Sequence, residues 1–117
     1  MDLIEIIKEN KKIVQSDICQ LSRDVDLNDI LSVVCAIVRI DRENVVGFIR
    51  KKRFIHARQL YCYFAMGTNK YSSTVTGERI NKDHSTVLYG ASKIKDYLYI
   101  KDPIICSYVK IITEILE

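Results

Sequence analysis

The fold of this chain is decided by residues 81–90, which read NKDHSTVLYG. The pair Asn81-Lys82 is expected to make a tight turn, and Asp83 directly after it is a favoured helix N-cap. The apolar residues that follow recur at helical spacing and predict a long helix. Its buried side is expected to carry Val87, Leu88, Ala91, Ile94 and Leu98. A short helix is expected just before the turn, near residues 74–80, so that the two form a helix-turn-helix.

Helical periodicity continues on both sides of this stretch, and the sequence predicts an all-α single domain over residues 1–117. The further expected helices cover residues 3–14, a short segment around 18–21, residues 29–39 with Asn28 as cap, residues 41–49 with Asp41 as cap, residues 56–66 ended by Gly67, and a last helix from Asp102-Pro103 through Ile115. The basic run at residues 50–53 interrupts the apolar pattern and predicts a loop.

Composition limits the classes of function. The 117 residues are 48% apolar and 28% charged, with one proline and four glycines, which is typical of one folded domain. No apolar run approaches the roughly 20 residues of a membrane span, the first residues do not resemble a signal peptide, and no phosphate loop of the G-x-x-x-x-G-K-[ST] type occurs. We therefore expect no membrane association, no nucleotide and no ATPase module.

Reactive side chains are few and scattered. Cys19, Cys35, Cys62 and Cys106 show no C-x-x-C spacing, and only His56 and His84 are available to complete a metal site with them. The favoured interpretation is reduced thiols packed as small apolar groups in the cytoplasm, and a zinc site or a disulfide is the alternative. Because no nucleophile with a base and an orienting carboxylate is evident, we expect no enzymatic activity, no metal and no cofactor.

Charge is concentrated in the middle of the chain. Residues 39–82 carry ten Lys and Arg against three acidic residues, whereas the segments on either side are mildly acidic. Such a distribution favours a surface that faces a polyanion. The tyrosines at positions 61, 63, 71, 89, 97 and 99 raise the alternative of stacking on single-stranded bases, but their helical spacing favours half-buried packing with hydroxyls at the surface.

Residues 83–90, DHSTVLYG, together with Lys93-Ile94, the basic run at 50–53 and the segment ARQL at 57–60, resemble the DNA-binding C-terminal domain (domain IV) of the bacterial replication initiator DnaA. The resemblance spans roughly residues 28–100 and implies a helical bundle of the Trp-repressor-like, DnaA domain IV-like type. It implies a stand-alone DNA-binding domain, with a phage or mobile-element origin as a further expectation. The turn Asn81-Lys82 replaces the Gly-Gly-Arg that is usual in the family.

The resemblance also implies roles for individual residues. Asp83, His84, Ser85 and Thr86 fall where the family contacts bases in the major groove, and Arg50 falls where a basic-loop arginine enters the minor groove. The expected phosphate contacts are Lys51, Lys52, Arg53, Arg58 and Lys82.

The expected function is sequence-specific binding of double-stranded DNA in the cytoplasm, at the nucleoid, to regulate replication or transcription. A second copy of the chain, or a replication or virion protein, is left open as a further partner. The alternative is a structural or protein-interaction module that kept the fold and lost sequence recognition.

Overall fold

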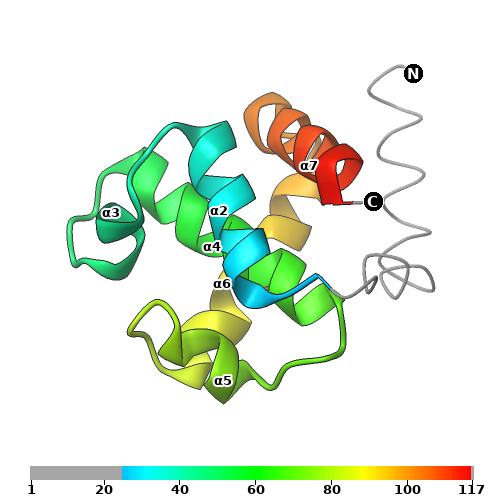
Figure 1. The fold of residues 1–117 in the computed structure, drawn as a ribbon. Coiled ribbons are helices and arrows are strands. Elements are labelled where there is room, and N and C mark those ends of the chain that lie inside the picture. The colour runs from blue at the N-terminus through cyan, green and yellow to red at the C-terminus, as the bar shows by residue number, and fades with distance from the viewer. Residues whose placement is uncertain (1–24, 117) are drawn as a thin grey trace.

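A computed structural model describes residues 25–116, so the helices expected at 3–14 and around 18–21, with Cys19, lie outside the described residues. The described part folds into the helices α2 (Leu27–Val38), α3 (Arg42–Val46), α4 (Lys52–Gly67), α5 (Ser73–Glu78), α6 (His84–Tyr99) and α7 (Pro103–Leu116) (Figure 1). It contains no strand between residues 25 and 116, and the all-α fold class is confirmed. No helix in this part is long and apolar enough to cross a membrane.

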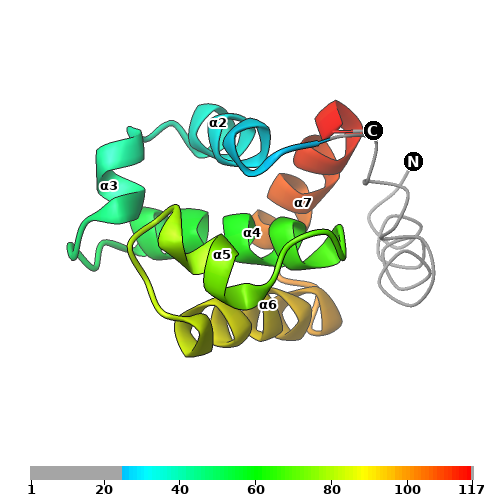
Figure 2. The same ribbon diagram turned by 60° about the horizontal axis from the view of Figure 1, so that its bottom comes forward.

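Helix α4 is the centre of the molecule. It contacts α2, α3, α5 and α6, and it lies between α2 on one side and α6 on the other in Figure 2, with α3 and α7 at opposite ends. Tyr61 and Phe64 of α4 are buried, and so are their neighbours around most of the helix circumference. A helix that is buried on nearly all sides needs partners on nearly all sides, and the other helices surround it.

The remaining helices bury one face each against this centre. Ile30 and Val34 of α2, Ile94 of α6 and Ile112 of α7 are each fully buried. Burying one such side chain contributes about 1.5–3 kcal/mol to folding. The core is continuous from α2 to α7, and it holds the helix-turn-helix formed by α5 and α6 in a fixed position against α4.

Two expected helix boundaries before α4 are wrong. The cap of α2 is Asp26 and not Asn28, because the Asp26 carboxylate accepts a hydrogen bond of 2.7 Å from the Asp29 N–H, and burial of Leu27 places the helix start earlier. Asn28 instead accepts a hydrogen bond from the side chain of Arg42. Asp41 does occupy the N-cap position of α3, but its side chain makes no capping hydrogen bond, and the helix ends at Val46 and leaves Ile49 outside it.

The expected ends of α4 are also wrong. The helix begins at Lys52, so only half of the basic run 50–53 is a loop, since charged side chains in a first turn can all point to solvent. Gly67 does not end α4 in a left-handed conformation. The cap is Thr68 with φ −73°, whose hydroxyl donates to the Ala65 carbonyl at 2.8 Å, and the left-handed residue is Asn69 with φ 58°.

Three further predictions need correction. The short helix expected at 74–80 covers Ser73–Glu78, capped by Ser72. Leu88 of α6 is exposed, and Gly90 takes the inner position between Val87 and Ala91. The tyrosines are not uniformly half-buried, because α4 at the centre of the fold buries Tyr61 and Tyr63 completely, whereas others lie on outer helix faces and are exposed, namely Tyr89 and Tyr99.

Candidate nucleic-acid interface

The first turn of α6 presents a row of short polar side chains to solvent. Asp83, His84, Ser85 and Thr86 are all exposed. The Asp83 carboxylate caps the helix by accepting a hydrogen bond of 2.8 Å from the Thr86 N–H. Hydrogen bonds from the N–H and hydroxyl of Thr86 lower the pKa of Asp83, which favours its charged form. This end of α6 is therefore open, and no packing within residues 25–116 covers it.

A close backbone approach sets the direction in which α6 leaves α5. The Gly77 carbonyl accepts hydrogen bonds from the N–H groups of Ile80, at 3.1 Å, and of Lys82, at 2.9 Å. Asn81 between them is left-handed, with φ 58°. A Cβ atom on Gly77 would lie 2.3 Å from the Lys82 carbonyl oxygen, a distance that cannot be tolerated. Gly77 is thus required for this turn, although the sequence pattern did not single it out.

Helix α4 supports α6 directly underneath the candidate interface. Val87 and Ile94 of α6 are fully buried on the side that faces the core. A Cβ atom on Gly90 would lie 3.4 Å from the Gln59 Cα and 3.5 Å from the Cys62 side chain. The two helices therefore pass close to each other at this point, and α6 rests on a rigid base.

Arg58 of α4 anchors the loop that joins α3 to α4. Its Nε donates to the Val45 carbonyl at 2.7 Å, and its Nη2 donates to the carbonyls of Asn44 and Gly47 at 2.8 Å and of Ile49 at 2.9 Å. Burial, and then the nearby charge of Arg50, lower the pKa of Arg58. Four carbonyls from one short segment converge on a single guanidinium, which fixes the path of the loop.

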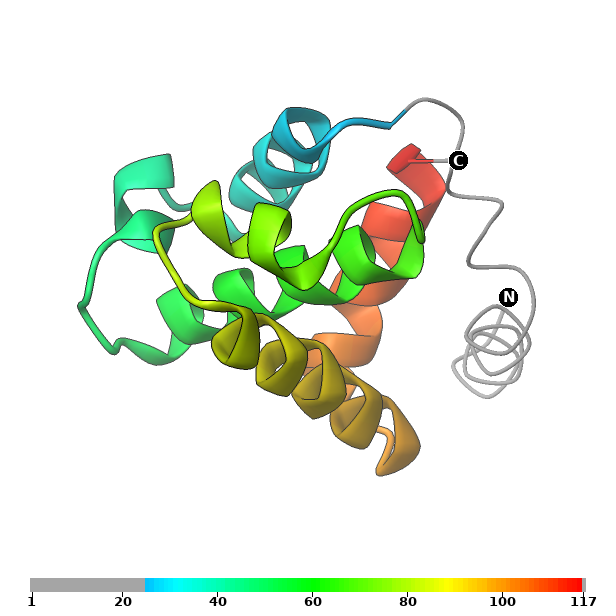
Figure 3. The ribbon, with the colours of Figure 1, turned by 90° about the horizontal axis from the view of Figure 1, so that it is seen from below.

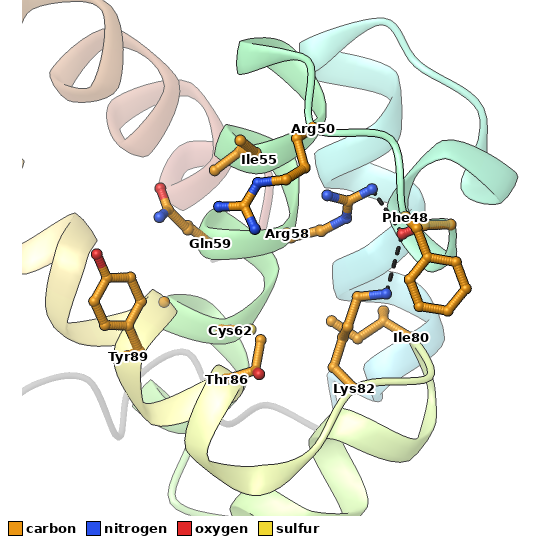
Figure 4. Close-up of a pocket in the computed structure, with 12 residues that line it drawn as sticks. Phe48, Arg50, Ile55, Arg58, Gln59, Cys62, Ile80, Lys82, Thr86 and Tyr89 are labelled. Atoms are coloured by element: carbon orange, nitrogen blue, oxygen red, sulfur yellow. Dashed lines mark hydrogen bonds between the residues drawn. The ribbon is translucent and has the colours of Figure 1, made fainter.

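Lys82 holds the same loop from the side of the helix-turn-helix. Its Nζ donates to the carbonyls of Val46 and Gly47 at 2.9 and 3.0 Å, and Figure 4 shows the Lys82 side chain directed toward the loop. Burial and the charge of Arg58 lower its pKa. Since Lys82 directly precedes the cap of α6, these bonds couple the position of the loop to the first turn of α6.

The remaining expected phosphate contacts divide into two kinds. Arg53 donates through Nη2 to the carbonyls of Val38 at 2.9 Å and Arg39 at 2.6 Å, at the end of α2, where a cation suits the carbonyl end of the helix dipole. Lys51 and Lys52 are exposed. Three of the five expected cations therefore have a structural role as well. Sequence alone could not reveal it, because the accepting carbonyls are 9 to 36 residues away.

A pocket of about 310 Å³ connects the loop with the first turn of α6. It is lined by Gly47, Phe48, Arg50, Ile55, Arg58, Gln59, Cys62, Ile80, Lys82, Thr86, Tyr89 and Gly90. In Figure 4 the Arg50 side chain extends from the loop across α4 into this space. Figure 3 shows the loop between α3 and α4 at the same end of the molecule as the start of α6. Arg50 and Thr86 thus open onto one shared surface, which carries no carboxylate among its lining residues.

Other chemistry has little support in the described part of the chain. Residues 25–116 hold no group of three or more His, Cys, Asp or Glu side chains arranged to bind a metal ion. Cys35, Cys62 and Cys106 are buried free thiols, and burial raises the pKa of Cys62 to about 12. A thiol that stays protonated is a poor nucleophile. His56 is buried against Tyr97, with ring centroids 5.8 Å apart.

Comparison with known proteins shows relatives of this chain. The chain is 33% identical over 78 residues to the chromosomal replication initiator protein DnaA of Bacteroides thetaiotaomicron, an alignment that covers 66% of this chain and 17% of that protein. It is 33% identical over 93 residues to the DnaA protein of Flavobacterium psychrophilum, covering 79% of this chain and 19% of that protein. For the DnaA protein of Bacteroides fragilis the identity is 30% over 86 residues, with 73% and 18% covered.

The chain spans less than a fifth of the length of these relatives. No solved structure matches it. Residues 27–94 match the family model described as the bacterial dnaA protein helix-turn-helix, and this segment includes α2 to α5, the supporting α4 surface and most of α6. The chain therefore belongs to the family of bacterial DnaA helix-turn-helix domains.

Proposed function

We propose that this protein binds double-stranded DNA in a sequence-specific manner, with the first turn of α6 in the major groove and Arg50 in the adjacent minor groove. The observation that carries the proposal is the shared surface on which Arg50 and Thr86 both open. The relatives are named as chromosomal replication initiators, which supports DNA as the ligand. A role in regulating replication or transcription, at the nucleoid, is part of the proposal.

The major-groove contacts would come from Asp83, His84, Ser85 and Thr86. The major groove is about 12 Å wide and admits a helix, provided that the side chains at its leading end are short. A carboxylate can accept from cytosine N4, hydroxyls can donate or accept, and the Thr86 methyl can pack against a thymine methyl. The positive end of the α6 dipole would also attract a phosphate next to the groove.

Arg58 and Lys82 can bind DNA phosphates while they hold the loop between α3 and α4. A lysine ammonium has three hydrogens, and two carbonyls use two of those on Lys82. Within residues 25–116, the Arg58 bonds involve Nε and Nη2, so the two hydrogens of Nη1 remain for an anion. Lys51 and Lys52 are exposed and add phosphate contacts without a structural cost. Binding would require no enzymatic step, metal, cofactor or nucleotide.

The proposal is tested by selecting bound duplexes from a random library and then measuring affinity by fluorescence anisotropy. The selected duplex is expected to bind much more tightly than a scrambled one, and His84→Ala is expected to reduce this difference by about 1–3 kcal/mol. The variant Arg50→Ala/Lys52→Ala should weaken binding to every duplex and reduce the salt slope by about 1 for each phosphate that the variant no longer neutralises. Lys95→Ala/Lys110→Ala is the charge-matched control, because neither residue lies in the loop or in the first turn of α6.

Equal affinity for selected and scrambled duplexes, in the wild type and both variants, would contradict sequence recognition. A wild-type protein that binds no duplex at low salt would contradict DNA binding altogether.

A second candidate function is protein interaction, and one feature of α7 favours it. Ile104, Ile111 and Ile115 are exposed, and with half-buried Tyr108 they follow the 4-3-4 spacing of a heptad seam. A second copy of the chain could pair along this stripe, which would give a two-fold symmetric DNA target. Light scattering measures the mass of the wild type and of Ile111→Glu in solution. A dimeric wild type and a monomeric variant would support pairing along α7, whereas monomers in both cases would contradict it.

A further inference from the structure

Phe48 is the most exposed of the large apolar side chains in residues 25–116, with 81% of its surface accessible. It lies in the loop between α3 and α4, two residues before Arg50. A protein gains nothing for folding from a phenyl ring in water. A single exposed apolar side chain is common on protein surfaces, so what the ring does depends on the groups around it.

The ring is held in place although it is not buried. The Lys82 ammonium lies 4.7 Å from the centroid of the Phe48 ring, a cation–π contact that leaves the ring in solvent. The backbone before it is fixed, because the Gly47 carbonyl accepts hydrogen bonds from both Arg58 and Lys82. Figure 4 shows the ring beside Lys82 at the edge of the pocket. An exposed aromatic side chain on an anchored backbone is arranged in advance for its partner.

Phe48 and Arg50 belong to the same surface although their side chains extend to different sides of it, as Figure 4 shows. Phe48 and Arg50 both line the shared pocket, whereas Ile49 between them does not.

We infer that Phe48 inserts between base pairs of the minor groove next to the position of Arg50 and partly unstacks one base step. The inference rests on the proposed function and adds a specificity-determining contact to it. The surroundings favour a polyanion with flat apolar surfaces, because the Lys82 ammonium lies over the ring and Arg50 lines the same pocket. Nucleic acid has both properties. Apolar wedges of this kind kink duplexes by about 20–90° and favour base steps that unstack easily.

The experiment uses the full chain and a selected duplex in which 2-aminopurine replaces single adenines along the minor-groove segment. Its fluorescence rises when a neighbouring base unstacks, so we expect a rise at one step on binding of the wild type. Phe48→Ala should abolish that rise and weaken affinity by about five- to 150-fold. Phe48→Trp should retain both signals. Ile49→Ala is the matched control from the same loop and should behave as the wild type.

Each outcome separates the two proposals. Since Phe48 is largely exposed and loses only a surface cation–π contact, Phe48→Ala should remain folded and unfold close to the wild-type temperature, which excludes misfolding as the cause of a loss. If the wild type binds the duplex but no step shows a rise, or Phe48→Ala binds and unstacks as the wild type does, insertion is refuted and DNA binding stands. If the wild type binds no duplex, the proposed function itself fails.

Discussion

Gly77→Ala is the substitution that tests the geometry of the helix-turn-helix most sharply. The added Cβ would lie 2.3 Å from the Lys82 carbonyl oxygen, and contacts below 3.0 Å are essentially never found, so the backbone must move by about 0.7 Å. Overpacking of this kind costs about 1–3 kcal/mol. The shift also weakens the hydrogen bond from Lys82 to the Gly77 carbonyl, worth about 1 kcal/mol, while Ala recovers up to about 1 kcal/mol of helix propensity.

The expected net loss is about 1–3 kcal/mol in the free energy of unfolding, which lowers Tm by roughly 5–20 °C in a domain of this size. Urea denaturation followed by circular dichroism measures it. Gly90→Ala is the matched control, because its Cβ would meet neighbours at 3.4–3.5 Å, an ordinary contact, and it should be neutral or slightly stabilising. The reasoning is refuted if Gly77→Ala is as stable as the wild type, or if Gly90→Ala is the more damaging of the two.

Three further predictions concern the cap, the loop and pH. Asp83→Ala should lower stability by about 1 kcal/mol because the Thr86 N–H loses its cap, whereas Asp83→Asn, which can still cap, should preserve stability; chemical denaturation measures both. Arg58→Lys removes most of the hydrogen bonds that fix residues 44–49 and should accelerate hydrogen exchange of the loop amides. Equal exchange rates in the variant and the wild type would contradict this role of Arg58. Burial and then the charge of Lys52 lower the pKa of His56 below 6.5, so the unfolded state takes up the proton first. The free energy of unfolding should therefore fall as the pH decreases below about 6.5, and His56→Phe should remove that part of the pH dependence.

Much of the fold follows from local pattern. The periodicity of Val87, Ala91, Ile94 and Leu98 predicted the buried side of α6, and Asp83 predicted its cap, because both depend on residues within one or two turns. The prediction for Leu88 was wrong because the apolar face expected for α6 included one residue too many beside Val87. The true inner residue is Gly90, which has no hydrophobic side chain to signal burial.

The parts of the site that sequence did not predict depend on long-range contacts. Arg58 and Lys82 were expected only to face phosphates, because a long cationic side chain does not indicate which distant carbonyls it meets. The sequence offered one signal for Gly77, namely its position inside a short helical segment. A glycine in such a position indicates a packing requirement, but it does not show which distant group packs against it. Phe48 and Ile49 were expected to follow the pattern of a short helix, and their exposure emerged only when α3 ended at Val46.

The most direct test is a methylation-interference experiment on the selected duplex with dimethyl sulfate, which modifies guanine N7 in the major groove and adenine N3 in the minor groove. The account predicts interference at both kinds of atom, in neighbouring segments, with the wild-type protein. In Arg50→Ala only the adenine N3 signal should disappear, and in His84→Ala the guanine N7 signal should weaken. Interference confined to a single groove in the wild type, or disappearance of both signals in Arg50→Ala with the fold intact, would contradict simultaneous binding of two grooves by one surface.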